Sequence, residues 1–171
     1  MKKIEKSVKK YAAMYQSALL RAGVGDAAQR AQSYAARLTD MYASDAYRQH
    51  DRYPTVRVPL VYAVIAMCLE LKDAGLQNGA IIDLVNDVFR ARKRALGCLE
   101  RGIDLFPFAW AVVRKWNIAD HEGRLQDGSI VYDAFQADAD RVSYRISRCM
   151  YAEMFDFYGI WELCKIFCMT D

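Results

Sequence analysis

The chain has 171 residues, of which 54% are hydrophobic, and its formal net charge is +3. This composition excludes a disordered tail, and the length is sufficient for one hydrophobic core, so we expect a single domain over residues 1–171. The charge is too small to argue for binding to nucleic acid or to a membrane, and neither is predicted as a partner.

Neither a secretory signal nor a membrane-spanning helix is expected. The N-terminal 20 residues begin basic and continue as an amphipathic pattern, without the unbroken apolar stretch of a signal peptide. The longest apolar run, VPLVYAVIAMCLEL, has 14 residues, whereas a helix that crosses a bilayer needs about 20. The five cysteines are an odd number without a disulfide framework spacing, which favours reduced thiols and a cytoplasmic location.

Residues 1–50 are predicted to form a pair of helices. Gly23 separates the two, and Asp26 followed by Gln29 resembles a capping box at the start of the second. These long amphipathic helices are also predicted to pair with a second copy of the chain, giving a homo-oligomer. The apolar residues that recur at intervals of three and four positions are Ile4, Val8, Tyr11, Tyr15 and Leu19, and then Ala31, Tyr34, Ala35, Leu38, Met41 and Tyr42.

Residues 51–120 are predicted to contain the core helices. Pro59 suits the first turn of a helix that ends at Gly75, and Asn78 caps the next one. A further helix is expected over DLFPFAWAVVRKWN, with Asp104 as its N-cap. The tyrosines and tryptophans are spaced as core residues rather than as platforms on which bases stack.

Residues 121–171 are predicted to form a β-hairpin followed by a helical hairpin. The polar stretch ADHEGRLQDG predicts a loop, and SIVYDAF and RVSYRISR then have the composition of strands. The second strand alternates Val142, Tyr144 and Ile146 with polar residues, as expected when one face is buried. The predicted fold class is therefore α+β, mostly helical with five to seven helices, and with a small antiparallel hairpin near the C-terminus.

The closing segment, RISRCMYAEMFDFYGIWELCKIFCMTD, contains three of the five cysteines. Cys149 stands where the strand gives way to a helix, a position at which the helix dipole and free amide groups favour the thiolate, and Glu153 follows one turn later. If the helix continues through Gly159, Cys149 and Cys168 are about 28 Å apart. If the chain reverses at Gly159, Cys168 and Asp171 return close to Cys149 and can share a pocket with it.

The alternative, which the sequence favours, is a purely structural role for the cysteines. Cys164 and Cys168, four residues apart on an aromatic-rich helix, are typical of core packing, as are Cys68 and Cys98 within predicted helices. Their spacing lacks the tight turn of a C-x2-C zinc knuckle, and no histidine is close in sequence. Neither a metal nor any other cofactor is predicted.

Two histidines and one basic run are weaker candidates. His50 has Asp51 beside it, but adjacent loop residues rarely face one pocket, so His50 is expected to face solvent. His121 is expected to be a polar loop residue for the same reason. The run RARKR is more typical of a solvated helix face than of a phosphate site.

The order of residues in the closing segment resembles a known family. A strand that runs into a cysteine is followed by YAEMF, a glycine, WEL, and a second cysteine with an aspartate three residues later in CKIFCMTD. This arrangement is similar to that of the L-2-amino-thiazoline-4-carboxylic acid hydrolase family, and VPLVYAVIAMCLELKDAG resembles an internal helix of that family. Members of that family continue beyond the position of Asp171, so the chain resembles a C-terminally shortened member.

The resemblance implies hydrolytic opening of a small cyclic amidine or thiazoline amino acid, giving an N-carbamoyl amino acid. Such a reaction needs an activated nucleophile or water, a proton for the leaving ring atom, and a cation for the substrate carboxylate. The alternative is a non-catalytic helical module that binds a ligand or another protein. For the hydrolase, the expected catalytic residues are Cys149, Glu153, Cys168 and Asp171, and the expected substrate-binding residues are Arg145 and Arg148.

Overall fold

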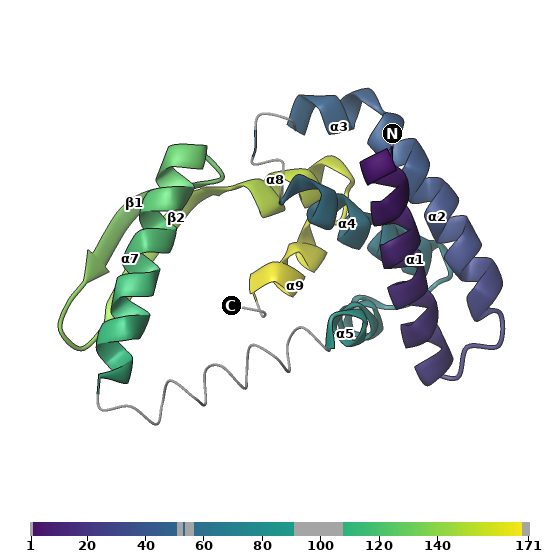
Figure 1. The fold of residues 1–171 in the computed structure, drawn as a ribbon, viewed down its shortest axis with the longest axis horizontal. Coiled ribbons are helices and arrows are strands. Elements are labelled where there is room, and N and C mark those ends of the chain that lie inside the picture. Colours follow the sequence, from purple (N-terminus) through teal and green to yellow (C-terminus); the bar gives the residue numbers. More distant parts are fainter. Residues whose placement is uncertain (1, 51–52, 54–56, 91–107, 169–171) are drawn as a thin grey trace.

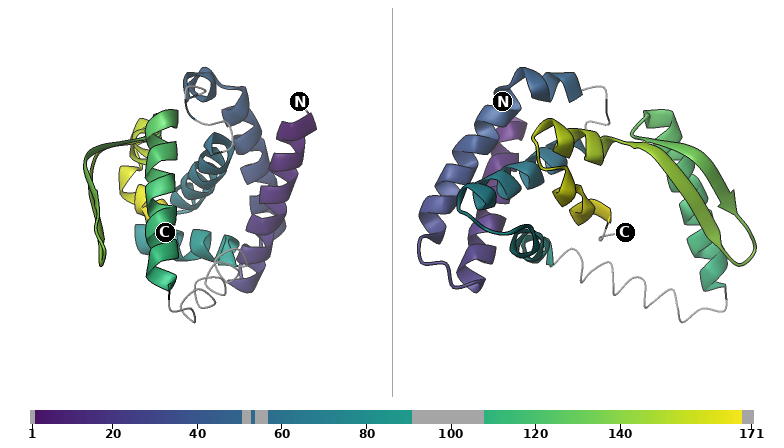
Figure 2. Two further views of the ribbon diagram at one scale, coloured as in Figure 1. Left: turned by 60° about the vertical axis from the view of Figure 1, so that its left-hand side comes forward. Right: turned by 180° about the vertical axis from the view of Figure 1, so that it is seen from behind.

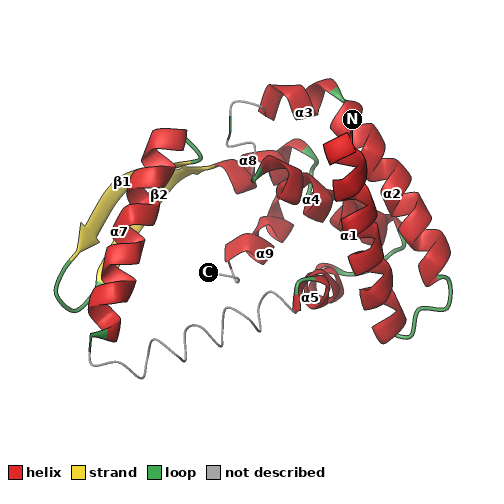
Figure 3. Ribbon diagram, in the orientation of Figure 1, coloured by secondary structure: helices red, strands yellow, loops and turns green. Residues whose placement is uncertain are grey.

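The computed structural model of the chain describes residues 2–50, 53, 57–90 and 108–168. Within these residues the fold is α+β and mostly helical, with a two-stranded antiparallel sheet near the C-terminus, as predicted (Figure 1, Figure 3). The elements in chain order are α1 (Lys2–Arg21), α2 (Ala27–Ala43), α3 (Asp45–Gln49), α4 (Val58–Asp73), α5 (Asn78–Val88), α7 (Ala109–Asp127), β1 (Ile130–Ala137), β2 (Val142–Cys149), α8 (Met150–Phe157), the 3-10 helix η2 (Trp161–Cys164) and α9 (Lys165–Cys168).

These elements form a helical body and an arm. The helical body consists of α1 to α5 together with α8, η2 and α9, whereas the arm, residues 109–149, consists of α7 and the β-hairpin (Figure 1). Figure 2 shows that the arm stands to one side of the body and is joined to it by the step from β2 into α8. The two parts differ in how much apolar surface they bury.

The helix α4 is the centre of the helical body because nearly every side of it is apolar. Pro59 lies in its first turn, as predicted, and Gly75, with φ at +80°, follows its C-terminus. A helix that is hydrophobic all round is buried, and α4 contacts α1, α2, α5 and α8. Its buried residues are Val58, Val61, Tyr62, Ala63, Val64, Ile65, Ala66, Met67, Cys68, Glu70 and Leu71.

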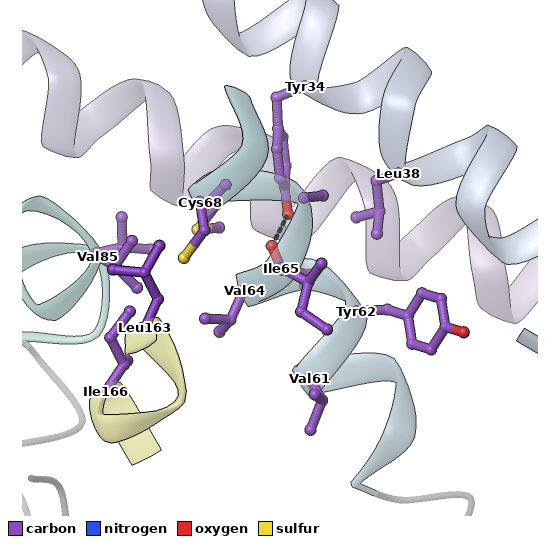
Figure 4. Close-up of a cluster of buried hydrophobic side chains, with 14 of the residues drawn as sticks. Tyr34, Leu38, Val61, Tyr62, Val64, Ile65, Cys68, Val85, Leu163 and Ile166 are labelled. Atoms are coloured by element: carbon purple, nitrogen blue, oxygen red, sulfur yellow. Dashed lines mark hydrogen bonds between the residues drawn. The ribbon is translucent and has the colours of Figure 1, made fainter. Parts of the chain in front are cut away.

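The helices α1 and α2 cover α4 with their apolar stripes. The Tyr34 hydroxyl of α2 donates a hydrogen bond to the Ala63 carbonyl at 3.2 Å, and Leu163 and Ile166 reach the same core beside Val85 (Figure 4). The predicted pairing of these helices with a second copy stays a prediction, and their apolar faces are already used within the chain. The residues buried in this way are Val8, Tyr15, Ala18, Leu19, Ala27, Ala31, Tyr34, Leu38, Met41 and Tyr42.

The predicted capping box at the start of α2 is wrong. Asp26 precedes α2, but its side chain accepts no hydrogen bond from the helix backbone. Its two carboxylate oxygens instead accept from Nε of Arg30, at 2.9 and 3.0 Å. This hydrogen bond from Arg30 lowers the pKa of Asp26. Because Arg30, one turn into the helix, binds the Asp26 carboxylate, that carboxylate does not cap the backbone amides of α2.

The helix α7 continues through the polar stretch ADHEGRLQDG, which was predicted to be a loop. Asp120 and Arg124 form an ion pair one turn apart, and the His121 ring stacks on Phe135 of β1 with centroids 3.8 Å apart. These contacts hold the polar half of the helix, which ends at Gly128, where φ is +66°. His121 is therefore a helix residue packed on the sheet, and its assignment to a loop is wrong.

The hairpin has the predicted strands but not the predicted burial. Phe135 lies opposite Tyr144, and Tyr132 lies opposite Ile146, so these four side chains share one face. Tyr144 is 58% exposed and Ile146 is 40% exposed, so the expectation that β2 has a buried face is wrong. The reason is that α7 packs mainly along β1 and leaves the apolar residues of β2 uncovered.

Aromatic residues divide between the core and the surface. Tyr15, Tyr34 and Tyr62 are fully buried, as predicted. Trp110 and Trp116 on α7 and Trp161 on η2 are 38%, 61% and 59% exposed, so the prediction that the tryptophans form core is wrong for all three.

Several sequence predictions concern residues that lie outside the described part of the chain. These are the N-cap Asp104, the cysteine Cys98 and most of the run RARKR. Cys68 is fully buried in α4, which confirms its packing role. Among the described residues, no helix is both long and apolar enough to cross a membrane.

Candidate functional site

The chain reverses at Gly159, which is the second of the two alternatives predicted for the closing segment. Gly159 adopts φ of +66°, and the amides of Gly159 and Ile160 donate to the carbonyls of Asp156 and Phe155 at 2.8 and 3.0 Å. This pair of bonds is the Schellman pattern that ends a helix.

The returning leg, η2 and α9, folds back against α8. The ring of Phe167 stacks on that of Tyr151 with centroids 4.5 Å apart and an interplanar angle of 7°. Phe167 also meets Phe155 edge-on at 6.0 Å. Tyr151 lies two residues after Cys149, so the end of the described chain returns to the N-terminal turn of α8.

Cys149 occupies the junction between the arm and the helical body. It pairs with Ile130 at the end of the sheet and is also the residue before the first turn of α8. Its side chain is half-buried and its thiol is free. The neighbouring amide of Met150 donates to the Ser129 carbonyl at 2.9 Å, which fixes the backbone at this step.

The predicted partners of Cys149 divide into described and undescribed residues. Glu153 lies one turn along α8, as predicted. Cys164, on η2, is half-buried against the core, in keeping with packing. The side chain of Cys168 and all of Asp171 lie outside the described residues, so their membership of the site stays a prediction.

Glu153 is held by two donors that come from different parts of the chain. Arg148 Nε donates to Glu153 Oε1 at 2.6 Å, and the Tyr53 hydroxyl donates to Glu153 Oε2. Arg148 Nη2 in turn donates to the Tyr53 hydroxyl oxygen at 3.1 Å. The three side chains thus form a closed ring of hydrogen bonds at the junction of β2 and α8, and the bond to Glu153 raises the pKa of Arg148.

This ring changes the chemical roles expected from the sequence. Both carboxylate oxygens of Glu153 already accept hydrogen bonds from side chains, so Glu153 is better suited to positioning its two donors than to taking a proton from a substrate. Arg148 has two nitrogens engaged, which leaves Nη1 for a ligand. Arg145 is exposed on β2 opposite Ala134, three residues further out along the arm.

Tyr53 was missed as a site residue, and His50, a weak candidate, was placed wrongly. His50 is only 7% exposed, so the expectation that it faces solvent is wrong. Its Nδ1 lies 2.7 Å from the buried Tyr62 hydroxyl, and its ring stacks on Tyr53 at 6.3 Å. Tyr53 is separated from Glu153 by 100 residues, and no spacing in the sequence could reveal that contact.

Arg57 is a further residue that the sequence did not reveal. Its Nη1 donates to the Ser129 hydroxyl at 3.2 Å, and its guanidinium lies 3.8 Å from Asp120 and 3.9 Å from Asp127. These contacts tie the start of α4 to α7 and to the residue that precedes β1. Since Ser129 also holds the Met150 amide, Arg57 helps to fix the backbone around Cys149.

Comparison with known proteins gives no match: no family model, no curated protein and no solved structure corresponds to this chain.

Proposed function

We propose that the chain is a hydrolase that opens a small cyclic amidine or thiazoline amino acid. The observation that supports this proposal is the ring of hydrogen bonds that joins a guanidinium, a carboxylate and a phenol where β2 meets α8, with Arg148 next to the half-buried Cys149 in the chain. The resemblance of the closing segment to the L-2-amino-thiazoline-4-carboxylic acid hydrolase family leads to the same reaction class. In this proposal the site is formed by Cys149, Arg148, Glu153 and Tyr53, with Cys168 and Asp171 as predicted additions.

Arg148 is assigned to the substrate carboxylate. The bonds from Nε to Glu153 and from Nη2 to Tyr53 fix the plane of the guanidinium and orient Nη1 for a ligand. A fixed cation positions the ring of a carboxylated substrate over the neighbouring thiol. Arg145 is the second candidate for this role, from its exposed position on β2.

Cys149 is assigned as the nucleophile. Its sulfur adds to the amidine carbon, the bond from that carbon to the ring sulfur breaks, and the ring sulfur leaves as a thiol after taking a proton. Water then attacks the same carbon, the bond to Cys149 breaks, and the oxygen of water becomes the carbamoyl oxygen. One water is consumed in the complete reaction.

Tyr53 is assigned as the proton donor to the leaving sulfur. Its hydroxyl carries the proton that it donates to Glu153 in this structure, and transfer to the leaving sulfur requires that bond to be exchanged for one to the substrate. Glu153 positions the two donors around it. Asp171 is retained as the base for the attacking water.

Thiol release tests the proposal directly, because opening a thiazoline ring liberates a product thiol that a colorimetric thiol reagent detects. We expect L-2-amino-thiazoline-4-carboxylate to be turned over by the unmodified chain and by Cys164→Ala, the matched control on η2. Cys149→Ala is expected to lower the rate by at least 10² to 10³-fold, on the scale of a lost catalytic group. Full turnover by Cys149→Ala would remove its catalytic role.

A second candidate function is a non-catalytic interaction module, and a specific observation favours it. The helix α7 contains no buried residue along its 19 positions, which is unusual for a helix with this many apolar side chains. A thiol probe separates the two candidates. Fast modification of Cys149 with a depressed pKa supports the hydrolase, whereas uniformly slow thiols together with no turnover support the module.

A further inference from the structure

The apolar surface left uncovered in the described residues is concentrated on the arm. Only Ile130 among the large apolar residues of the arm is buried. A single helix on a two-stranded hairpin is too small to build a core of its own, so its apolar faces need another surface. The large apolar residues that are exposed on or next to the arm are Phe108, Trp110, Val112, Trp116, Leu125, Val131, Tyr144 and Ile146.

One side of α7 packs against the β-hairpin. Trp110 Nε1 donates to the Ala139 carbonyl, Arg114 donates to the Asp138 carbonyl at 3.4 Å, and His121 stacks on Phe135. At 100° per residue these three helix positions point the same way. The opposite side of α7 is therefore turned away from the sheet.

That opposite side carries an apolar row, which we call the outer stripe. Val112 is 42% exposed and Trp116 is 61% exposed, and Ala119 and Gly123 are also exposed. The four positions are spaced by four, three and four residues, the spacing of a helix–helix seam. The side chains of the outer stripe are large at its N-terminal end and small at its C-terminal end, so two parallel copies would place large side chains against large ones.

We propose that the outer stripe binds the outer stripe of a second copy, with the two α7 helices antiparallel. In that register Trp116 of one copy lies over Ala119 of the other, and Val112 lies over Gly123. Each large side chain then meets a small one, which lets the helix axes approach closely. A two-fold axis between positions 117 and 118 relates the two copies, as required for a closed dimer.

The charges on α7 support the same pairing. Lys115 and Glu122 are seven residues apart, so they lie on the same flank of the outer stripe. Both are exposed, and neither forms an ion pair within the described part of the chain. In an antiparallel dimer, residues on the same flank of the two helices face each other, so Lys115 of each copy lies across from Glu122 of the other. The pair forms twice, once on each side of the two-fold axis.

The proposal is tested by measuring mass in solution, with sedimentation equilibrium or light scattering over a concentration series. We expect a species of twice the 19.6 kDa chain mass that dissociates on dilution. Trp116→Ala is expected to weaken the dimer roughly a hundredfold, because a central tryptophan is lost from both copies. Trp161→Ala, which removes an equally exposed tryptophan on η2, is the matched control and is expected to leave the dimer unchanged.

Charge reversal distinguishes this interface from a general loss of structure. Lys115→Glu alone and Glu122→Lys alone are each expected to weaken the dimer about tenfold, because they place like charges across from each other twice. The double variant Lys115→Glu/Glu122→Lys restores the pairs and is expected to recover the dimer. Both positions are exposed, so unchanged circular dichroism is expected throughout.

Three results would overturn the proposal. The first is a chain that stays monomeric at every concentration, which would mean that another segment or another protein covers the stripe. The second is a dimer that tolerates Trp116→Ala, which would place the contact elsewhere. The third is a double charge variant that stays as weak as the single variants. All three outcomes are measured as mass in solution, whereas the hydrolase proposal is tested by thiol release, so either proposal can fail without the other.

Discussion

The turn at Gly159 provides the sharpest prediction for stability, because its cost can be worked out from the backbone alone. Gly159 has φ of +66°, in the left-handed region, where an L-residue with a Cβ is strained by about 1–2 kcal/mol. A Cβ added there meets no atom within 4 Å, so no steric clash adds to this strain. Gly159→Ala is therefore expected to lower the free energy of unfolding by about 1–2 kcal/mol, which corresponds to a fall of roughly 2–8 °C in Tm.

Urea denaturation followed by circular dichroism measures this effect, and Gly79→Ala is the matched control. Gly79 lies in the first turn of α5, has no positive φ, and also has open space around its Cβ position. Alanine is a better helix former than glycine, so Gly79→Ala is expected to raise stability by up to about 1 kcal/mol. Gly159→Asn should cost less than Gly159→Ala, since asparagine tolerates the left-handed region. Equal stability of Gly159→Ala and the unmodified chain would contradict the reversal described at this position.

Two further predictions concern the core of the helical body. Arg37 Nε donates to the nearly buried carboxylate of Glu70 at 3.0 Å, so Arg37→Leu leaves that carboxylate without its arginine. The free energy of unfolding measured in urea is expected to fall by about 1–3 kcal/mol. Arg48→Leu is the control: it breaks an ion pair whose two side chains are more than 70% exposed, and is expected to change that free energy by less than about 0.5 kcal/mol. Burial raises the pKa of the Cys68 thiol from 9.0 to about 12, so the folded chain keeps a proton that the unfolded chain loses between these values. Stability is therefore expected to fall as pH rises from 9, by up to about 1.4 kcal/mol per pH unit from this thiol, and the thiol is expected to resist labelling until the chain unfolds. Equal losses in the two arginine variants, or rapid labelling of Cys68 in the folded chain, would contradict this account of the core.

The sequence predicted the parts of the fold that depend on local pattern. An unbroken apolar run bounded by Pro59 and Gly75 is sufficient to identify a buried central helix, because a helix without a polar face must be surrounded. Strand-like composition identified both strands, and alternation supported the second. A reversal at Gly159 was one of the two alternatives left open by the sequence, and it is the one that the structure shows. These signals lie within a few residues of each other, where backbone geometry limits the choices.

The sequence could not predict contacts that depend on the tertiary fold. Tyr53 reaches Glu153 across 100 residues, and His50 is buried by Tyr62 and Phe157 from two different helices. Periodicity carries no information about such pairs. The prediction that one face of β2 is buried was wrong for a related reason. Alternation shows that one face of a strand is apolar, but it does not show that another part of the chain covers that face. Tyr144 and Ile146 alternate with polar residues as predicted, but their side chains are exposed.

The hydrolase proposal and the dimer proposal concern different surfaces of the arm and can be tested independently. The ring of Tyr53, Arg148 and Glu153 lies where β2 enters α8, whereas the outer stripe lies on the side of α7 turned away from the hairpin. Changing Lys115 or Glu122 therefore alters no contact of that ring. If the double charge variant recovers the dimer while thiol release stays constant across the series, the arm serves assembly and the junction serves chemistry. If turnover instead follows the dimer fraction, the site depends on how the arm is held, and the contacts of Arg57 with Ser129 and Asp127 are the link by which α7 would influence the backbone at Cys149.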